Sequence, residues 1–179
     1  MIKILPPTMR KKSKGIIAVR IILLLLIILN LILIWTNSAK VSEESNKTST
    51  IIAEGVAKKV VKDFEILDKS QQKTHVKELN TKIRSMAHFG EFIPLGLLFC
   101  FLWINIFDKK ENKEFYFLLS ALVFALLMSG LCALFDEIHQ IFVKGRSFQL
   151  IDIATDTFGA FCGSVSSLLA RGIFVFSKK

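Results

Sequence analysis

The feature that most constrains the chain is a set of four long apolar blocks. They cover residues 16–35, 89–107, 115–135 and about 153–176. The third block contains no charged residue, and only Arg20 and Asn30 interrupt the first. At about 1.5 Å of rise per residue, each block is about as long as the ~30 Å hydrocarbon layer of a bilayer. The blocks therefore predict an all-α integral membrane bundle of about four transmembrane helices.

The basic residues predict an orientation in the membrane. The formal net charge is +9, and the lysines and arginines at both ends of the chain flank apolar blocks. Because they do not line a face with interleaved stacking aromatics, we expect no nucleic-acid partner. The N-terminal cluster predicts a cytosolic segment at 1–15 and a transmembrane helix at 16–36. A cleaved signal peptide is the competing interpretation, but its apolar region would be unusually long.

Four spans return the C-terminus to the side of the N-terminus. We therefore expect a multi-pass protein of the bacterial plasma membrane with both ends cytoplasmic. The polar residues 37–83 then form an extracytoplasmic segment. Ile52, Val56, Val60, Phe64 and Leu67 recur in steps of four and three, which predicts one apolar helix face. Such an amphipathic helix would lie on the outer membrane surface or pack on the bundle.

Charged residues gather at the predicted outer ends of the last three blocks. Arg84 and His88 precede the second block, and Glu91 lies near its start. Asp136, Glu137, His139 and the polar Gln140 directly follow the third block, Arg146 comes next, and Asp152 and Asp156 lie at the start of the fourth. Ionisable side chains at membrane depth are costly and commonly functional. Their concentration at one leaflet predicts a polar pocket between the helices that opens to the outside.

Three kinds of chemistry fit these residues. His88, His139, Asp136 and Glu137 are candidates for general acid–base catalysis. Candidate ligand-binding residues are Arg84, Glu91, Gln140, Arg146, Asp152 and Asp156, with the arginines suited to phosphate. Internal ion pairing alone is the third interpretation. A divalent metal also accepts histidine and carboxylate ligands, but the HExxH spacing is absent, and we predict no metal or other cofactor.

Four short patterns resemble the VanZ-like family of bacterial envelope proteins. They are R-x-x-x-H-F-x-E-F at 84–92, D-E-x-H-Q at 136–140, G-R at 145–146 and D-x-x-x-D-x-x-G-x-x-x-G at 152–163. The chain has Phe92 where the family usually has Tyr, and Asp156 where it often has Asn. The resemblance covers roughly residues 80–172 and implies a membrane domain at 84–176. That domain would hold three transmembrane helices and a short re-entrant or surface segment at 136–152.

The resemblance also implies a role in the envelope, since the family's best-known member confers low-level resistance to the glycopeptide teicoplanin. Three functions remain open from the sequence. The expected pocket binds a lipid headgroup or a lipid-linked cell-wall precursor, or it modifies such a substrate as an enzyme, or the chain is a small transporter. The last is least supported, because the polar residues stop at one leaflet. Membrane lipids are the expected partners, and the sequence does not indicate an oligomeric state.

Overall fold

The protein folds into five helices in a computed structural model that describes residues 7–39, 42–107, 114–144 and 146–176. The helices are α1 (Pro7–Ser38), α2 (Ser42–Val60), α3 (Lys69–Ile106), α4 (Glu114–Gln140) and α5 (Leu150–Phe176). The described residues contain no strand. Four helices, all except α2, are long and apolar enough to cross a bilayer. The predicted all-α bundle of four transmembrane helices is therefore confirmed.

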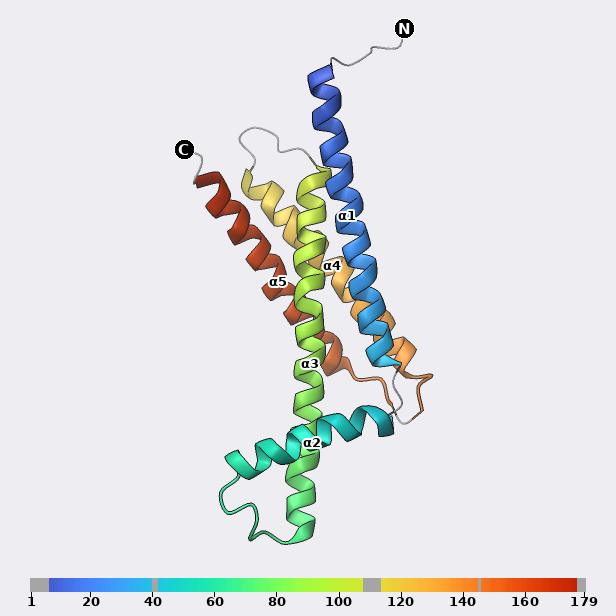
Figure 1. Ribbon diagram of the computed structural model, residues 1–179, viewed down its shortest axis with the longest axis vertical. Coiled ribbons are helices and arrows are strands. Elements are labelled where there is room, and N and C mark those ends of the chain that lie inside the picture. Colours follow the sequence, from blue (N-terminus) through green and yellow to red (C-terminus); the bar gives the residue numbers. More distant parts are fainter. Residues whose placement is uncertain (1–6, 40–41, 108–113, 145, 177–179) are drawn as a thin grey trace.

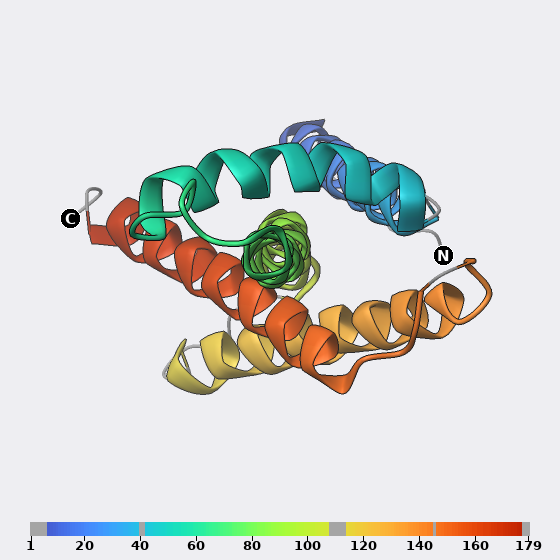
Figure 2. The ribbon, with the colours of Figure 1, turned by 90° about the horizontal axis from the view of Figure 1, so that it is seen from below.

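The four long helices run alternately up and down, with α3 at the centre (Figures 1 and 2). In the view along the bundle, α1 and α2 cover one side of α3, and α4 and α5 cover the other (Figure 2). We call one end of the bundle the terminal end; it holds Arg20, Ile106 and Arg171. The opposite end, which holds Ser38, Gln140 and Asp152, is the polar end. The helix α2 and the connection from α4 to α5 lie at the polar end (Figure 1).

Glycines bring α3 and α5 into backbone contact. A Cβ atom added to Gly159 would overlap the carbonyl oxygen of Phe89, and one added to Gly163 would overlap that of Ile93. Gly96 of α3 faces the α5 backbone in the same way. Small residues spaced in this manner are typical of tightly packed membrane helices. This contact fixes the polar residues of α3 and α5 at one level.

The buried face of α4 is made of small residues at helical spacing. Ala121, Ala125, Ser129 and Ala133 recur every four residues, and all are buried. The same face continues into Asp136, Glu137 and Gln140, which are also buried. The buried face of α4 is therefore formed by small residues over most of its length and by acidic and amide side chains in its last turn. The acidic side chains consequently point between the helices and not toward lipid.

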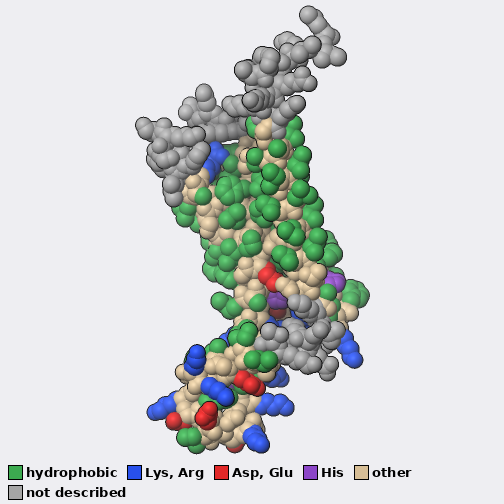
Figure 3. Space-filling view, viewed as in Figure 1, with side chains coloured by type: hydrophobic (Ala, Val, Ile, Leu, Met, Phe, Trp, Pro, Cys, Tyr) green, Lys and Arg blue, Asp and Glu red, His purple; other side chains and the backbone are tan. Residues whose placement is uncertain are grey.

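The α2–α3 hairpin projects from the polar end. The helix α3 has 38 residues and is about 57 Å long, so it exceeds the ~30 Å hydrocarbon layer and its first turns extend beyond the bundle. The helix α2 crosses this projecting part of α3 (Figure 1). Charged side chains surround the projection, whereas the bundle surface above it is largely apolar (Figure 3).

Two details of the predicted segments differ from the structure. The predicted apolar face is only partly packed: Phe64, just after α2, is buried, but Ile52 is 50% and Val60 is 73% exposed, while Ala53 and Ala57 are buried. The small side chains of Ala53 and Ala57 allow α2 to approach α3 closely, so these alanines form its buried face. The helix α3 is also continuous through the predicted boundary between residues 83 and 84.

The predicted re-entrant or surface segment at 136–152 begins and ends in helix. Residues 136–140 complete α4, and residues 150–152 begin α5. The connection between them is residues 141–149, of which all but 145 are described. The acidic residues of this segment therefore belong to the ends of two long helices.

Candidate functional site

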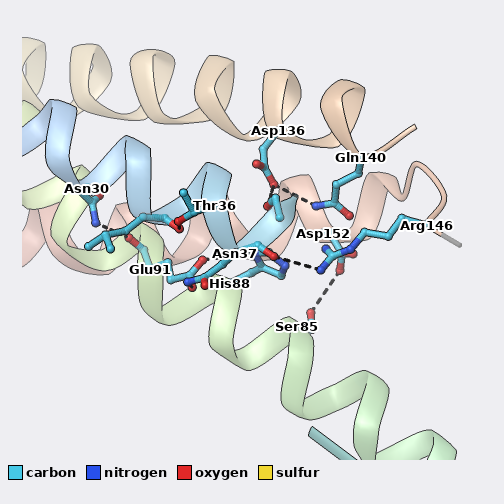
Figure 4. Close-up of polar contacts among 12 residues, drawn as sticks. Asn30, Thr36, Asn37, Ser85, His88, Glu91, Asp136, Gln140, Arg146 and Asp152 are labelled. Atoms are coloured by element: carbon cyan, nitrogen blue, oxygen red, sulfur yellow. Dashed lines mark hydrogen bonds and ion pairs between the residues drawn. The ribbon is translucent and has the colours of Figure 1, made fainter. Parts of the chain in front are cut away.

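The polar end contains a cluster of polar side chains from four helices, which we call the polar cluster. Its members are Asn37, Ser38, Arg84, Ser85, His88, Glu91, Asp136, Glu137, His139, Gln140, Arg146, Asp152 and Asp156. Figure 4 shows most of them between α1, α3, α4 and α5. All ten residues that the sequence singled out thus lie at one end of the bundle. Their catalytic or binding roles remain predictions.

Asp136 is the most enclosed carboxyl group of the cluster. Its side chain is 0% exposed. Atom Oδ2 accepts hydrogen bonds from Ser38 Oγ at 2.6 Å and from Gln140 Nε2 at 3.0 Å. Atom Oδ1 is buried and has no partner. A buried carboxylate oxygen without a partner is costly, so Asp136 retains capacity for a further donor.

Glu91 joins α3 to α1. Its Oε1 accepts a hydrogen bond from Asn37 Nδ2 at 2.6 Å. Its Oε2 lies 3.5 Å from His88 Nδ1, one turn earlier on α3. That distance is too long for a good hydrogen bond, so the contact is mainly electrostatic. His88 also interacts electrostatically with Asp156 and Asp136.

Glu137 and Asp152 hold the surrounding chain in place. Glu137 is buried, and its Oε2 accepts a hydrogen bond at 2.7 Å from the backbone N–H of Gln149, just before α5 begins. A carboxylate at this position satisfies a free N–H at the helix N-terminus and complements the helix dipole. Asp152 Oδ1 accepts a hydrogen bond from Ser85 Oγ at 3.3 Å, which links α5 to α3. Both acids therefore have a structural contact.

The two arginines of the cluster keep unused donors. Arg146 Nη2 donates to the backbone oxygen of Asn37 at 3.3 Å, but its Nε and Nη1 are buried without a partner. Arg84 Nε is likewise buried and unpartnered. Burial and the positive charge of Arg84 lower the pKa of Arg146, against the opposing influence of the nearby acids. Two neighbouring guanidinium groups with free N–H groups are suited to an anion.

His139 and Asp156 have fewer contacts. The His139 ring stacks on Trp35 of α1, with centroids 5.7 Å apart and an interplanar angle of 10°. Its Nδ1 is buried without a hydrogen bond. His139 lies one turn after Asp136 on α4, but the hydrogen bonds of Asp136 go to Ser38 and Gln140. Asp156 is 1% exposed, and its Oδ1 has no partner.

Sequence reasoning missed the contribution of α1. Asn30, Asn37 and Ser38 all point toward α3 or α4, and Asn30 Nδ2 donates to the backbone oxygen of Glu91 at 3.4 Å. A usable signal was present, because Asn37 and Ser38 follow Asn30 by seven and eight residues and so share its helix face. Buried Ile27 and Ile34 belong to the same face.

Metal binding receives no support from the described residues. Among them, no group of three or more His, Cys, Asp or Glu side chains is arranged to hold a metal ion. The cluster instead combines hydrogen-bond donors and acceptors from separate helices. Its arrangement suits a ligand that carries both an acceptor group and a donor group.

The fold and the cluster together define a class: a multi-pass membrane protein with buried charges at one end of its bundle. A family model described as VanZ/LLP1 matches residues 21–171, so the chain belongs to the VanZ/LLP1 family. The match begins within the first span, well before the four patterns at 84–163. It therefore includes α2 and most of α1. No curated protein and no solved structure matches the chain significantly.

Proposed function

We propose that the chain is a bacterial plasma-membrane protein whose polar cluster binds the phosphate-bearing headgroup of a membrane lipid or a lipid-linked cell-wall precursor. The observation that carries this proposal is the set of free donors on Arg84 and Arg146, at the end of a membrane bundle. Guanidinium groups bind phosphate through paired N–H donors. A buried N–H donor without a hydrogen-bond partner is costly, so the free nitrogens of Arg84 and Arg146 favour a ligand with acceptor oxygens.

The proposal places the polar cluster at the outer surface. The first turns of α1 and the last turns of α5 share one end of the bundle, opposite the cluster (Figure 1). Basic residues precede α1's apolar stretch and follow that of α5, which favours a cytoplasmic location for this end. A reporter enzyme active only outside the cytoplasm should be active when fused after residue 62 and inactive when fused after residue 110. The reverse pattern would contradict the orientation.

Lipids that co-purify with the protein provide the direct test. Mass spectrometry of lipids from wild type and Arg146→Ala should show one phosphate-bearing species enriched by the wild type and depleted about tenfold by the substitution, which corresponds to about 1.4 kcal/mol. Lys144→Ala is the matched control, since Lys144 is an exposed basic residue two positions away. An identical lipid profile in wild type and Arg146→Ala would refute headgroup binding by this arginine.

A second candidate function is acid–base modification of the bound lipid. The specific observation is the His88–Glu91 contact at 3.5 Å beside the unpartnered oxygens of Asp136 and Asp156. The cluster holds five carboxyl groups and two histidines, which are the side chains that most often act as general acids and bases. An enzyme would change the lipid pool of cells that overproduce it. His88→Ala should then restore the pool at an unchanged protein level, whereas an unaltered pool in wild-type overproducers would exclude this function.

Teicoplanin resistance is the physiological role that we attach to headgroup binding. Its support is family membership together with the free guanidinium donors. Cells that produce the wild type should tolerate more teicoplanin than cells that produce Arg146→Ala at an equal membrane level. Equal sensitivity of both strains and of an empty-vector strain would remove resistance from the proposal.

A further inference from the structure

An apolar groove runs along the bundle between α1 and α4. It has a volume of about 290 Å³ and is lined by Ile28, Leu31, Ile32, Trp35, Cys132 and Phe135. Trp35 and Phe135 are 51% and 58% exposed, so the groove opens sideways from the bundle. Both walls belong to helices that are apolar enough to span a bilayer. The groove therefore faces the hydrocarbon layer and not water.

The helices α1 and α4 contact each other at the polar end, next to the groove. There, Ser38 Oγ donates to Asp136 Oδ2, and Trp35 stacks on His139. Along the remaining length, α1 packs chiefly on α3. Ile28 and Trp35 lie two turns apart, so this wall of the groove is about 10 Å long.

The groove and the polar cluster are continuous. Trp35 lines the groove with one part of its side chain surface and stacks on the His139 ring of the cluster. One turn further along α1, Ser38 reaches the buried carboxyl group of Asp136. An amphiphile in this position would have its apolar part against Ile28, Leu31 and Ile32. Its polar part would then lie at the level of the cluster.

We propose that this groove holds one acyl chain of the bound lipid, which enters sideways from the bilayer between α1 and α4. The inference rests on the proposed headgroup binding and adds that the ligand is recognised with its chain attached. The volume lies at the lower limit of ~300 Å³ for ligand pockets, which suits part of a single chain and not a whole lipid. A soluble headgroup without a chain would lack the apolar contacts with the groove.

The test compares a lipid with its deacylated headgroup. The full-length protein in detergent is titrated with dioleoyl phosphatidylglycerol and with glycerophosphoglycerol, and bound adducts are quantified by native mass spectrometry. We expect the wild type to bind the lipid at least about tenfold more tightly than the headgroup. Cys132→Phe fills the groove and should remove that difference. Leu131→Phe is the matched control, because Leu131 is 48% exposed and does not line the groove.

The outcomes separate the groove from the headgroup site. Arg146→Ala should weaken both ligands, whereas Cys132→Phe should weaken only the lipid. If Cys132→Phe binds the lipid as the wild type does, or if the wild type binds both ligands equally, the acyl-chain site is refuted while the Arg146 result still decides the headgroup proposal. Absence of lipid binding by the wild type, with the deacylated headgroup bound, would also refute the groove.

A second measurement covers the case in which Cys132→Phe does not fold. In a Trp103→Phe background, Trp35 is the sole tryptophan of the chain. Vesicles of phosphatidylcholine with one tenth brominated phosphatidylglycerol should quench Trp35 more than the average bromine content predicts. Quenching at the average content would mean that no phosphatidylglycerol chain is retained beside Trp35, and would overturn the proposal.

Discussion

Arg20 and Arg146, which lie at opposite ends of the bundle, differ in how many of their N–H donors have a hydrogen-bond partner. At the terminal end, Arg20 of α1 donates from Nε and Nη2 to the carbonyl oxygen of Asn105, at 3.0 and 2.6 Å. Nη2 also donates to Ile106 at 3.2 Å. These are free carbonyl groups of the last turn of α3, so Arg20 caps that helix. At the polar end, Arg146 makes one hydrogen bond of 3.3 Å and has two buried nitrogens without a partner.

The difference separates an arginine that holds the fold from one that is available to a ligand. Backbone carbonyl groups accept hydrogen bonds from both Nε and Nη2 of Arg20, so this guanidinium group holds α1 against the end of α3. At the terminal end, Trp103 Nε1 donates to Ser120 Oγ at 3.1 Å, and the Arg171 guanidinium group lies 5.2 Å from the centre of the Phe117 ring, with Nε buried and unpartnered. At the polar end, unpartnered nitrogens and oxygens occur together. We read that concentration as the mark of the site.

Both ends of the bundle depend on the close packing of α3 against α5, so disrupting that contact should have the largest effect. Gly163→Leu places a side chain where Ile93 O already lies, so α3 and α5 must separate. We expect a loss of stability on the order of 4 kcal/mol or more, seen as failure to purify folded protein. Gly172→Leu in the same helix is the control, since nothing lies within 4 Å of its added Cβ. A stable Gly163→Leu protein that retains lipid binding would show that close α3–α5 packing does not position the polar cluster.

Alanine substitution of Arg20 and of Arg146 should have opposite effects on stability and on lipid affinity. Arg20→Ala removes hydrogen bonds from a charged donor and should cost about 2 kcal/mol, with lipid affinity unchanged. Arg146→Ala should do the opposite, with stability nearly unchanged and affinity reduced. Thermal unfolding in detergent and lipid titration of the same preparations measure both quantities. If both variants lose stability equally and neither loses affinity, the polar cluster is only an internal ion-pair network.

Asp156→Asn should change stability less than the preceding substitutions, and it should raise stability, unlike most substitutions. The carboxyl group is 1% exposed and its Oδ1 lacks a partner, so a neutral amide of equal size is less costly to bury. We expect a gain of about 1 kcal/mol in stability, together with weaker binding of any ligand that donates to this oxygen. Asp152→Asn is the comparison, because Asp152 already accepts a hydrogen bond from Ser85. Destabilisation by Asp156→Asn alone would reveal a partner for its charge.

The sequence was sufficient for the spans and for the position of the polar end. A block such as residues 115–135 has no soluble alternative, and its length matches a bilayer. The steps of three and four within Arg84, His88 and Glu91 were enough to place them on one helix face. Spans of alternating direction then bring the ends of the last three blocks to the same leaflet. These inferences depend on local spacing and chain direction alone.

Helix rotation was not predictable in the same way. Ile52 and Ala53 are neighbours on α2, and the apolar pattern favoured the isoleucine, yet Ala53 packs and Ile52 is 50% exposed. Near a membrane, an exposed isoleucine carries little cost, so hydrophobicity does not determine which face packs. The partnership of Arg20 with the end of α3 is likewise a tertiary contact between residues far apart in sequence. In the sequence, Arg20 is recognisable only as a charge that interrupts the first apolar block.

The smallest expected effect lies outside the bundle, at the start of α3. Asp68 accepts hydrogen bonds from the backbone N–H groups of Ser70 and Gln71, at 2.7 and 3.0 Å, and caps the helix. These bonds lower the pKa of Asp68, so the cap is present above the ordinary aspartate pKa of about 3.9 and is lost as the pH falls through the lower folded value. Asp68→Ala should reduce helicity slightly. The difference in helical circular dichroism signal between this variant and the wild type should disappear on acidification, because the wild type then loses the cap as well.

The Asp68 variant also bears on how far the polar cluster extends. The cap lies on the projecting hairpin, more than four turns of α3 before His88, so neither arginine contact depends on it. Lipid affinity should consequently match the wild type, and Glu65→Ala should change neither helicity nor affinity. A loss of affinity in Asp68→Ala would mean that the α2–α3 hairpin is coupled to the cluster. The site would then include the projection, and the contrast between the two ends of the bundle would have to be redrawn.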